Sequence, residues 1–124
     1  MNNHNNDILE YMALNKTTPV NFTKTGVVLF LNEPKWIFPF KKTKLLANVK
    51  VVIPDKTFGL ITSLGYNGID VFTDVINESD DTYVYIKVKR TGLFPKKLKN
   101  DMPIALLTIV PCVEFQLVEN NDMD

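Results

Sequence analysis

The sequence predicts an all-β protein built as a barrel or sandwich. Short runs of β-branched and aromatic residues follow one another along most of the 124-residue chain, separated by turn signals rich in Gly, Pro, Asn and Asp. Almost no stretch has the spacing of three and four residues that marks an amphipathic helix. At this length we expect one domain with one core, burying about two thirds of its unfolded surface.

Residues 1–19 are expected to form an N-terminal arm or a short helix. Asn6 or Asp7 is a suitable N-cap for such a helix. The apolar residues that follow at helical spacing are Ile8, Tyr11 and Met12. Because two turns of helix are marginal alone, this segment has to dock on the domain or fray.

Two strands are expected early in the domain, which spans residues 20–118. Thr25–Leu31 is apolar at nearly every position, as in a strand buried on both faces. Trp36–Phe40 is a short aromatic strand, and Pro39 places it at an edge or a bulge because proline cannot donate to a neighbouring strand. The lysine-rich residues 41–44 are expected to form a solvated turn.

Alternating patterns mark two later strands. In residues 45–53 every second residue from Val49 onward is apolar, so Asn48 and Lys50 are expected on the outer face. The cleanest alternation lies in residues 83–89, where valine and isoleucine face one way and tyrosine and lysine the other.

The middle of the chain places two apolar strands on either side of a polar loop. The strands are expected within residues 53–61 and 68–77, and the loop, Thr62–Asn67, contains a glycine. Three segments complete the chain: a buried strand at 104–110, an alternating strand at 113–118 and an acidic tail at 119–124.

Charge and rare residues exclude several classes of function. Lys+Arg and Asp+Glu both number 14, so no overall basic field attracts nucleic acid or an anionic membrane, and neither is expected as a partner. Cys112 is the single cysteine and His4 the single histidine. An internal disulfide and a zinc site with several thiolates are therefore excluded, and a catalytic triad is disfavoured.

The order of strands and turns over residues 25–112 resembles the trimeric dUTP pyrophosphatase (dUTPase) family. The fragments that carry the resemblance are Ile53–Asp55, Phe58–Ile61, Gly68–Val71 with Val75–Glu78, and Ile104–Leu107 with Val110–Cys112. The first two are similar to the strand before the phosphate-binding loop, the next two to the strand and β-hairpin that hold deoxyuridine, and the last two to the family's isoleucine-alanine-glutamine-leucine strand. The resemblance implies a dUTPase-like β-barrel, of the β-clip or jelly-roll kind, and a trimer.

The chain departs from the family at the residues that carry its chemistry. Val28 occupies the place of an Asp, and Leu106 that of a glutamine. The loop at 62–67 is shorter than the family's and has no cation. Asn77 stands where the family has the Asp that orients the attacking water, and an amide cannot act as a general base. Asp80 aligns with the Tyr that packs under the sugar.

These departures predict no catalytic residue and only a residual ligand site. Its candidate residues are Ser63, Gly65, Tyr66, Asn67, Gly68, Asn77 and Asp80. Ser63 and the backbone around Gly65 suit an anion, but nothing nearby neutralises several phosphate charges. The family's glycine-rich C-terminal arm is also missing from residues 119–124.

Two polar groups have both a functional and a structural interpretation. Oxygen-bearing side chains gather at Asp70, Asp74, Asn77, Glu78, Asp80 and Asp81. They suit a divalent cation, although a solvated turn is favoured and no metal is expected. Tyr83 and Tyr85 beside Lys87 and Lys89 suit base stacking and phosphate contacts, although cross-strand pairs or a subunit interface are favoured.

Two apolar features are interpreted in the same way. Trp36, Phe38 and Phe40 suit an anchor for a protein partner, although core or trimer packing is favoured. Cys112 follows a proline at the end of a buried strand, so inert packing is expected.

We expect a non-catalytic, dUTPase-like pseudoenzyme, of viral or phage origin, that acts through protein–protein interaction or as a structural or accessory component. The alternatives are a protein that binds a nucleotide without turnover and an active dUTP nucleotidohydrolase with an altered site. A homo-oligomer is expected, with a trimer favoured, and Mg²⁺ only where a nucleotide is bound. The N-terminal residues do not match a signal peptide, so we expect the cytoplasm or nucleus of a host cell, or a virion.

Overall fold

The computed structural model describes residues 8–15, 18, 20–78, 82–113 and 116–122. This part of the chain forms eleven strands and no helix, and so holds no helix that spans a membrane. The bounds are β1 Glu10–Ala13, β2 Asn21–Phe22, β3 Gly26–Phe30, β4 Lys35–Ile37, β5 Lys42–Val52, β6 Thr57–Ser63, β7 Ile69–Val71, β8 Asp74–Asn77, β9 Thr82–Arg90, β10 Lys96–Leu98 and β11 Pro103–Pro111.

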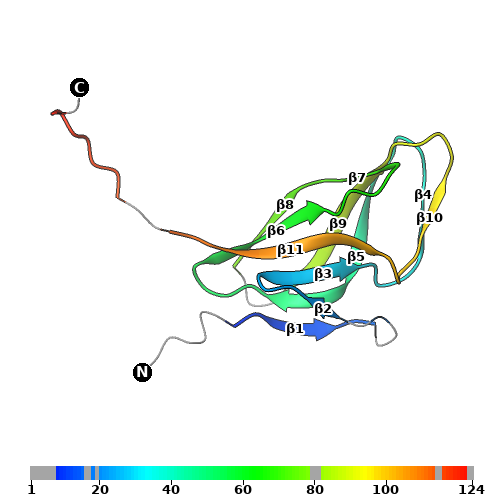
Figure 1. Ribbon diagram of the computed structural model, residues 1–124, viewed down its shortest axis with the longest axis horizontal. Helices are drawn as coiled ribbons and strands as arrows, with labels where there is room; N and C mark the ends of the chain where they lie inside the picture. The colour runs from blue at the N-terminus through cyan, green and yellow to red at the C-terminus, as the bar shows by residue number, and fades with distance from the viewer. Residues whose placement is uncertain (1–7, 16–17, 19, 79–81, 114–115, 123–124) are drawn as a thin grey trace.

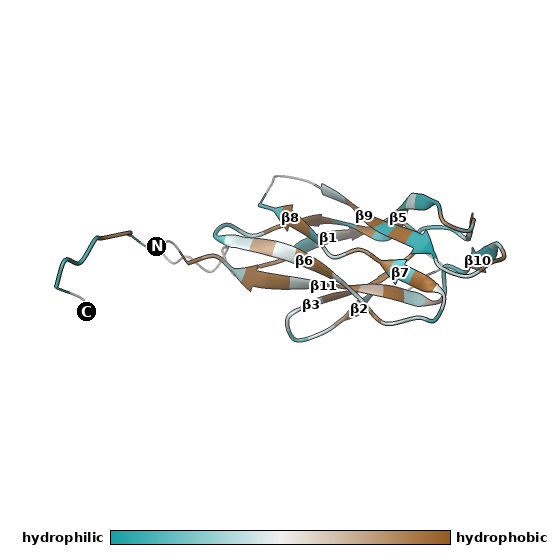
Figure 2. Ribbon diagram, turned by 90° about the horizontal axis from the view of Figure 1, so that it is seen from above, coloured by the Kyte–Doolittle hydropathy of each residue, from teal (hydrophilic) through white to brown (hydrophobic). Residues whose placement is uncertain are grey.

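Two antiparallel sheets enclose one core (Figure 1 and Figure 2). The four-stranded sheet has the order β1-β5-β9-β7, and the five-stranded sheet has the order β2-β3-β11-β6-β8. β4 and β10 pair at one end of the molecule. Apolar side chains from both large sheets meet in a single cluster. The all-β fold class predicted from the sequence is therefore confirmed.

The core side chains come from the alternation that the sequence shows. On β9, Val84, Ile86 and Val88 are fully buried, while Tyr83 and Tyr85 are exposed on the other face. β3 is buried at four of its five positions, as predicted for this strand. Each fully buried valine or isoleucine contributes about 1.5–3 kcal/mol relative to an exposed one.

β5 corrects two expectations. It begins at Lys42, so residues 42–44 of the expected turn are part of a strand. Its register with β9 shifts between Leu46 and Lys50, and this bulge turns the side chain of Asn48 into the core. Asn48 is 0% exposed, and its Oδ1 accepts a hydrogen bond of 3.3 Å from the Phe30 amide.

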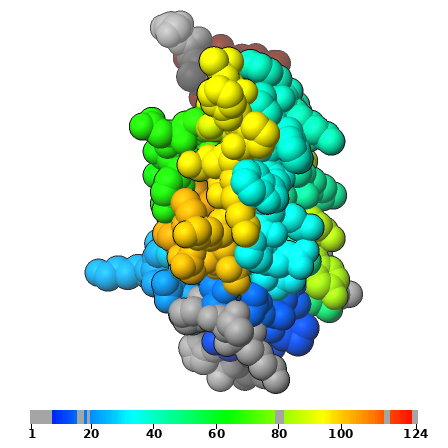
Figure 3. All heavy atoms as spheres, turned by 90° about the vertical axis from the view of Figure 1, so that its right-hand side faces the viewer, coloured from blue at the N-terminus to red at the C-terminus, as the bar shows by residue number. Residues whose placement is uncertain are grey.

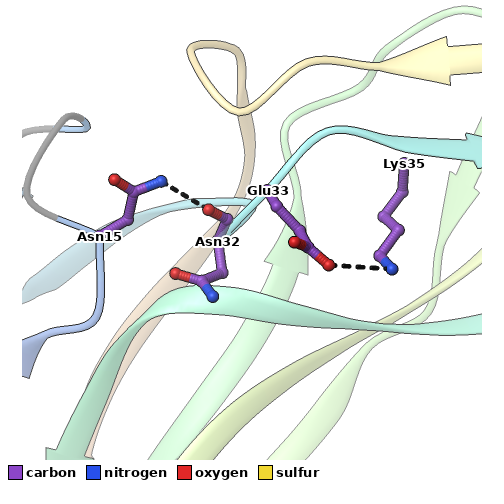
Figure 4. Close-up of polar contacts among 4 residues, drawn as sticks. All are labelled: Asn15, Asn32, Glu33 and Lys35. Carbon is purple, nitrogen blue, oxygen red and sulfur yellow. Dashed lines mark hydrogen bonds and ion pairs between the residues drawn. The ribbon is translucent and has the colours of Figure 1, made fainter.

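The N-terminal segment is a strand at the residues where a helix was considered. β1 pairs with β5 at the edge of the four-stranded sheet, with Met12 opposite Lys50. The rings of Tyr11 and Phe22 meet edge to face at 4.9 Å. Figure 4 shows Asn15 donating from Nδ2 to the Asn32 carbonyl at 2.6 Å. Strand pairing thus replaces the helix because β5 offers an unpaired edge.

Beyond β11 the described residues, 112–113 and 116–122, contain no strand. The strand expected at 113–118 is therefore wrong for its described part. This segment leads away from the sheets in Figure 1, and its apolar side chains at Val113, Leu117 and Val118 are exposed.

Candidate functional site

The loop between β6 and β7 is where the resemblance predicts a phosphate-binding site. It turns through Gly65 and Gly68, whose φ angles of 82° and 77° lie in the left-handed region that glycine adopts at little cost. The Ser63 hydroxyl accepts a hydrogen bond of 2.9 Å from the Gly65 amide and so stabilises the turn. Tyr66 packs partly against the core, while Asn67 is exposed. These five predicted residues are indeed neighbours.

A cation that sequence reasoning missed reaches this loop from the end of β9. Arg90 donates from Nη1 to the Gly68 carbonyl at 2.7 Å and from Nε to the Phe94 carbonyl at 2.8 Å. The Thr91 amide donates to the same Gly68 carbonyl at 3.0 Å. A Cβ at Gly68 or Gly92 would lie too close to the guanidinium, so a larger residue at either position would force the Arg90 side chain to move. Arg90 therefore fixes two loops; the only signal in the sequence was an arginine before a Thr-Gly turn.

β7 and β8 follow one another in the chain but belong to different sheets. β7 pairs with β9 in the four-stranded sheet, whereas β8 pairs with β6 in the five-stranded sheet. Phe72 and Thr73 alone connect them, so the chain crosses from one sheet to the other within two residues. The resemblance places the deoxyuridine-binding hairpin at Val75–Glu78 and on to Asp80, between β8 and β9. Residues 79–81 of that turn lie outside the described residues, so the hairpin stays a prediction.

Asn77 lies far from the loop within one chain. It pairs with Phe58 near the start of β6, whereas the loop follows Ser63 at the end of the same strand. Five residue steps along a strand span roughly 17 Å. Asp80 lies outside the described residues. The seven predicted site residues are therefore not one constellation in a single protomer.

Three residues from the segments in which the chain departs from the family lie side by side instead. Leu106 on β11 is directly opposite Val28 on β3 and directly opposite Thr62 on β6. All three are half-buried and share the outer side of the five-stranded sheet. The positions where the resemblance calls for an Asp and a glutamine are thus adjacent and apolar. Such side chains neither orient water nor hold a cation.

This outer side of the sheet is mostly apolar, with the polar residues Thr62, Thr108 and Asn77 among the apolar ones. We call it the apolar outer face: Val28, Phe58, Leu60, Val75, Leu106 and Val110. These residues alternate with core residues such as Ile61 and Leu107, and they are half-buried or exposed. A half-buried apolar sheet face is typical of a subunit interface.

A second exposed surface lies at the end of the molecule that is formed by β4, β10 and the turn after β9. Aromatic side chains gather there. We call this the aromatic end: Trp36, Phe38, Phe40, Leu93 and Phe94. Figure 3 views this end, where the yellow segment near residue 90 adjoins the cyan segment near residue 40. Trp36 is 57% exposed, Phe40 67% and Phe94 74%. Of the core or trimer packing favoured from the sequence for Trp36, Phe38 and Phe40, core packing is therefore wrong, and trimer packing stays a prediction.

Within the described residues no three His, Cys, Asp or Glu side chains gather closely enough to hold a metal ion. Asp74 instead pairs with Lys87 at 3.2 Å, and Glu78 accepts a hydrogen bond of 2.8 Å from the Lys56 amide. Cys112 is exposed, which corrects the expectation that it packs in the interior.

No family model matches the chain, and no curated protein matches it. Solved structures of phage dUTPases do match. A mutant dUTPase of phage phi11 of S. aureus, described with a structural Mg(II) ion, has a TM-score of 0.75 at 18% identity, over 94% of this chain and 99% of that chain. A mutant dUTPase of Staphylococcus bacteriophage 80alpha with dUpNHpp has a TM-score of 0.74 at 19% identity, over 95% and 99%. The chain has a dUTPase-like fold.

Proposed function

Starting from this dUTPase-like fold, we propose that the protein is a non-catalytic, phage or viral relative of the dUTPases that acts by binding other proteins. One observation carries the proposal: Val28 and Leu106 are adjacent, apolar and on the outer side of the sheet. A nucleotidohydrolase of this fold needs polar groups there to place water and phosphate.

The aromatic end supports a role in protein binding. Large aromatic side chains that are exposed as a group are costly in a soluble protein unless a partner covers them. Trp and Phe are also typical anchors at the centre of interfaces. The Arg90 bond to the Phe94 carbonyl holds this surface in a fixed shape, which lowers the entropy cost of binding.

The apolar outer face supports self-association as the second part of the proposal. A homotrimer places half-buried residues such as Leu60 and Val110 against a neighbouring protomer. The phage proteins of similar fold are dUTPases described with nucleotide or Mg(II). For this chain we propose no resident metal, with Mg²⁺ entering only alongside a bound nucleotide.

A nucleotide panel tests the proposal against its two alternatives. Thermal melting with dUTP and Mg²⁺ is expected to show no shift, and no pyrophosphate is expected. A ligand that binds only the folded state at 100 times its Kd raises stability by about 2.7 kcal/mol, so binding without turnover is readily seen. A shift without product supports nucleotide sequestration instead. Product at ordinary rates rejects the proposal.

A single reversion sharpens this test. Asn77→Asp restores the carboxylate that the resemblance assigns to the water-orienting position. Because the apolar Val28 and Leu106 remain, the variant is expected to stay inactive on dUTP. Turnover by Asn77→Asp would mean that the rest of the site is intact and that the protein descends from an active form by one change.

A further inference from the structure

Two pairs of lysines lie directly opposite each other on the outer face of the four-stranded sheet. Lys42 pairs with Lys89, and Lys44 pairs with Lys87, in the register of β5 and β9. Directly opposite residues have Cβ atoms about 4.5–5.5 Å apart, and like charges in such pairs are destabilising. Folding therefore does not account for four cations in this arrangement. We call these four residues the lysine face.

Carboxylates balance the lysine face only along one edge. Asp74 pairs with Lys87 at 3.2 Å, and Asp70 lies opposite Lys89 in the register of β7 and β9. In the described part of the chain, no carboxylate lies within 4 Å of Lys42 or Lys44. The β5 side of this face is thus a local positive region on a chain whose net charge is zero.

Aromatic rings lie among these cations. The Lys44 ammonium lies 4.4 Å from the Tyr85 ring centroid, and the Lys42 ammonium lies 4.9 Å from that of Phe72. Between them is a shallow hollow of about 390 Å³, lined by both lysines, Phe72, Asp74 and Lys87. Tyr83, Tyr85, Lys87 and Lys89 all project from the same side of β9. The face therefore offers cations and π surfaces within one strip.

We propose that the lysine face binds single-stranded nucleic acid, with lysines on the phosphates and Tyr85 and Phe72 against the bases. Rows of cations with interleaved aromatic rings are how β-barrel proteins bind single strands without sequence preference. A duplex keeps its base faces stacked inside, so it gains nothing from the rings. The net charge of zero predicted no nucleic-acid partner. Binding of an anion, however, depends on the local charge of the lysine face and not on the net charge of the chain.

Fluorescence anisotropy of a labelled dT oligomer of about 20 nucleotides tests the proposal with the full-length chain. If about four phosphates are contacted, the affinity falls about 50-fold between about 50 and 200 mM salt. The matching duplex is expected to bind more weakly. Absence of binding at protein concentrations up to about 100 µM, the weak limit for nonspecific complexes, overturns the proposal.

Variants locate the site. Lys42→Gln with Lys44→Gln is expected to lower affinity at least tenfold and to flatten the salt dependence by about two phosphate contacts. Lys24→Gln with Lys99→Gln removes the same charge elsewhere and is expected to change little. The first variant should melt at the same or a higher temperature, because it relieves like-charge pairs. Equal losses of affinity in the two double variants would contradict a defined binding site on the lysine face.

Tyr85→Leu separates base stacking from simple charge attraction. Loss of one stacked base is expected to weaken binding of the dT oligomer about fivefold or more. If polyglutamate or anionic lipid vesicles bind as tightly as the oligomer and Tyr85→Leu has no effect, the surface is an acidic-protein or membrane site and the nucleic-acid proposal fails.

Discussion

Gly65 and Gly68 share a left-handed backbone, but an added Cβ would meet another side chain only at Gly68. Nothing lies within 4 Å of a Cβ built at Gly65, whereas one built at Gly68 meets the guanidinium of Arg90. Gly65→Ala is therefore expected to cost about 1–2 kcal/mol of backbone strain alone. Gly68→Ala should cost more, because it also displaces the Arg90 contacts. Urea denaturation measures both values.

A double-mutant cycle isolates the Arg90 clamp. Arg90→Ala alone loses hydrogen bonds from a charged donor, each worth about 1.5–3 kcal/mol. In that background Gly68→Ala should cost no more than Gly65→Ala, since the side chain that it displaced is gone. Additive effects of Gly68→Ala and Arg90→Ala would show that the guanidinium is not the obstacle.

Substitution of Phe40 tests whether the aromatic end contributes to the stability of the fold. Its φ of 60° is left-handed, and its ring is 67% exposed. Phe40→Gly relieves strain of about 1–2 kcal/mol while removing little buried area, so the melting temperature is expected to stay the same or rise. The control is Ile37→Gly on β4, which removes a fully buried side chain and should be strongly destabilising. A large loss of stability for Phe40→Gly would assign the ring to packing.

At the scale of elements, β5 shows where sequence reasoning succeeds and fails. The sequence predicted β3 from its continuous apolar run and β9 from its unbroken alternation. In β5 one bulge shifts the phase, so Asn48 points inward although the pattern placed it outside. Lys42 and Lys44 were predicted to lie in a turn because charged side chains need solvent. The exposed face of a sheet gives them the same access to solvent.

The burial of Asn48 at the β5 bulge can be tested by substitution. The Asn48 Nδ2 atom is buried and has no hydrogen-bond partner in the described structure. Asn48→Asp keeps the acceptor for Phe30 but buries a carboxyl, and burial raises the pKa of such a group above its unfolded value of about 3.9. The variant should therefore lose stability as pH rises from about 4 to 7 relative to the parent. Asn21→Asp, on exposed β2, should show no such trend in urea titrations.

The candidate site was predictable only in part, for a related reason. Residues 63–68 are close in sequence and therefore close in space. Asn77 was assigned to them by its place in a motif, and strand pairing puts it at the other end of β6. Arg90 was missed because its contact with Gly68 joins residues 22 positions apart. The position of Asn77 and the contact of Arg90 both depend on the register between strands. This register cannot be derived from a single sequence.

At the scale of the whole molecule, the apolar outer face predicts self-association. Leu60 lies between Thr108 and Val75 on this face. Leu60→Glu places a charge in the proposed interface and should convert a trimer to monomers in multi-angle light scattering. Lys24→Glu, at an exposed turn, is the matched control. A parent protein that is already a clean monomer would contradict the interface.

Whether this dUTPase-like fold still performs nucleotide chemistry is the central question, and dUTP turnover answers it most directly. Purified protein with dUTP and Mg²⁺ is assayed for pyrophosphate, with melting curves on the same samples. The account predicts no product above the uncatalysed background and no change in melting temperature. Pyrophosphate release at an ordinary enzymatic rate, about 1 per second or faster, would contradict it.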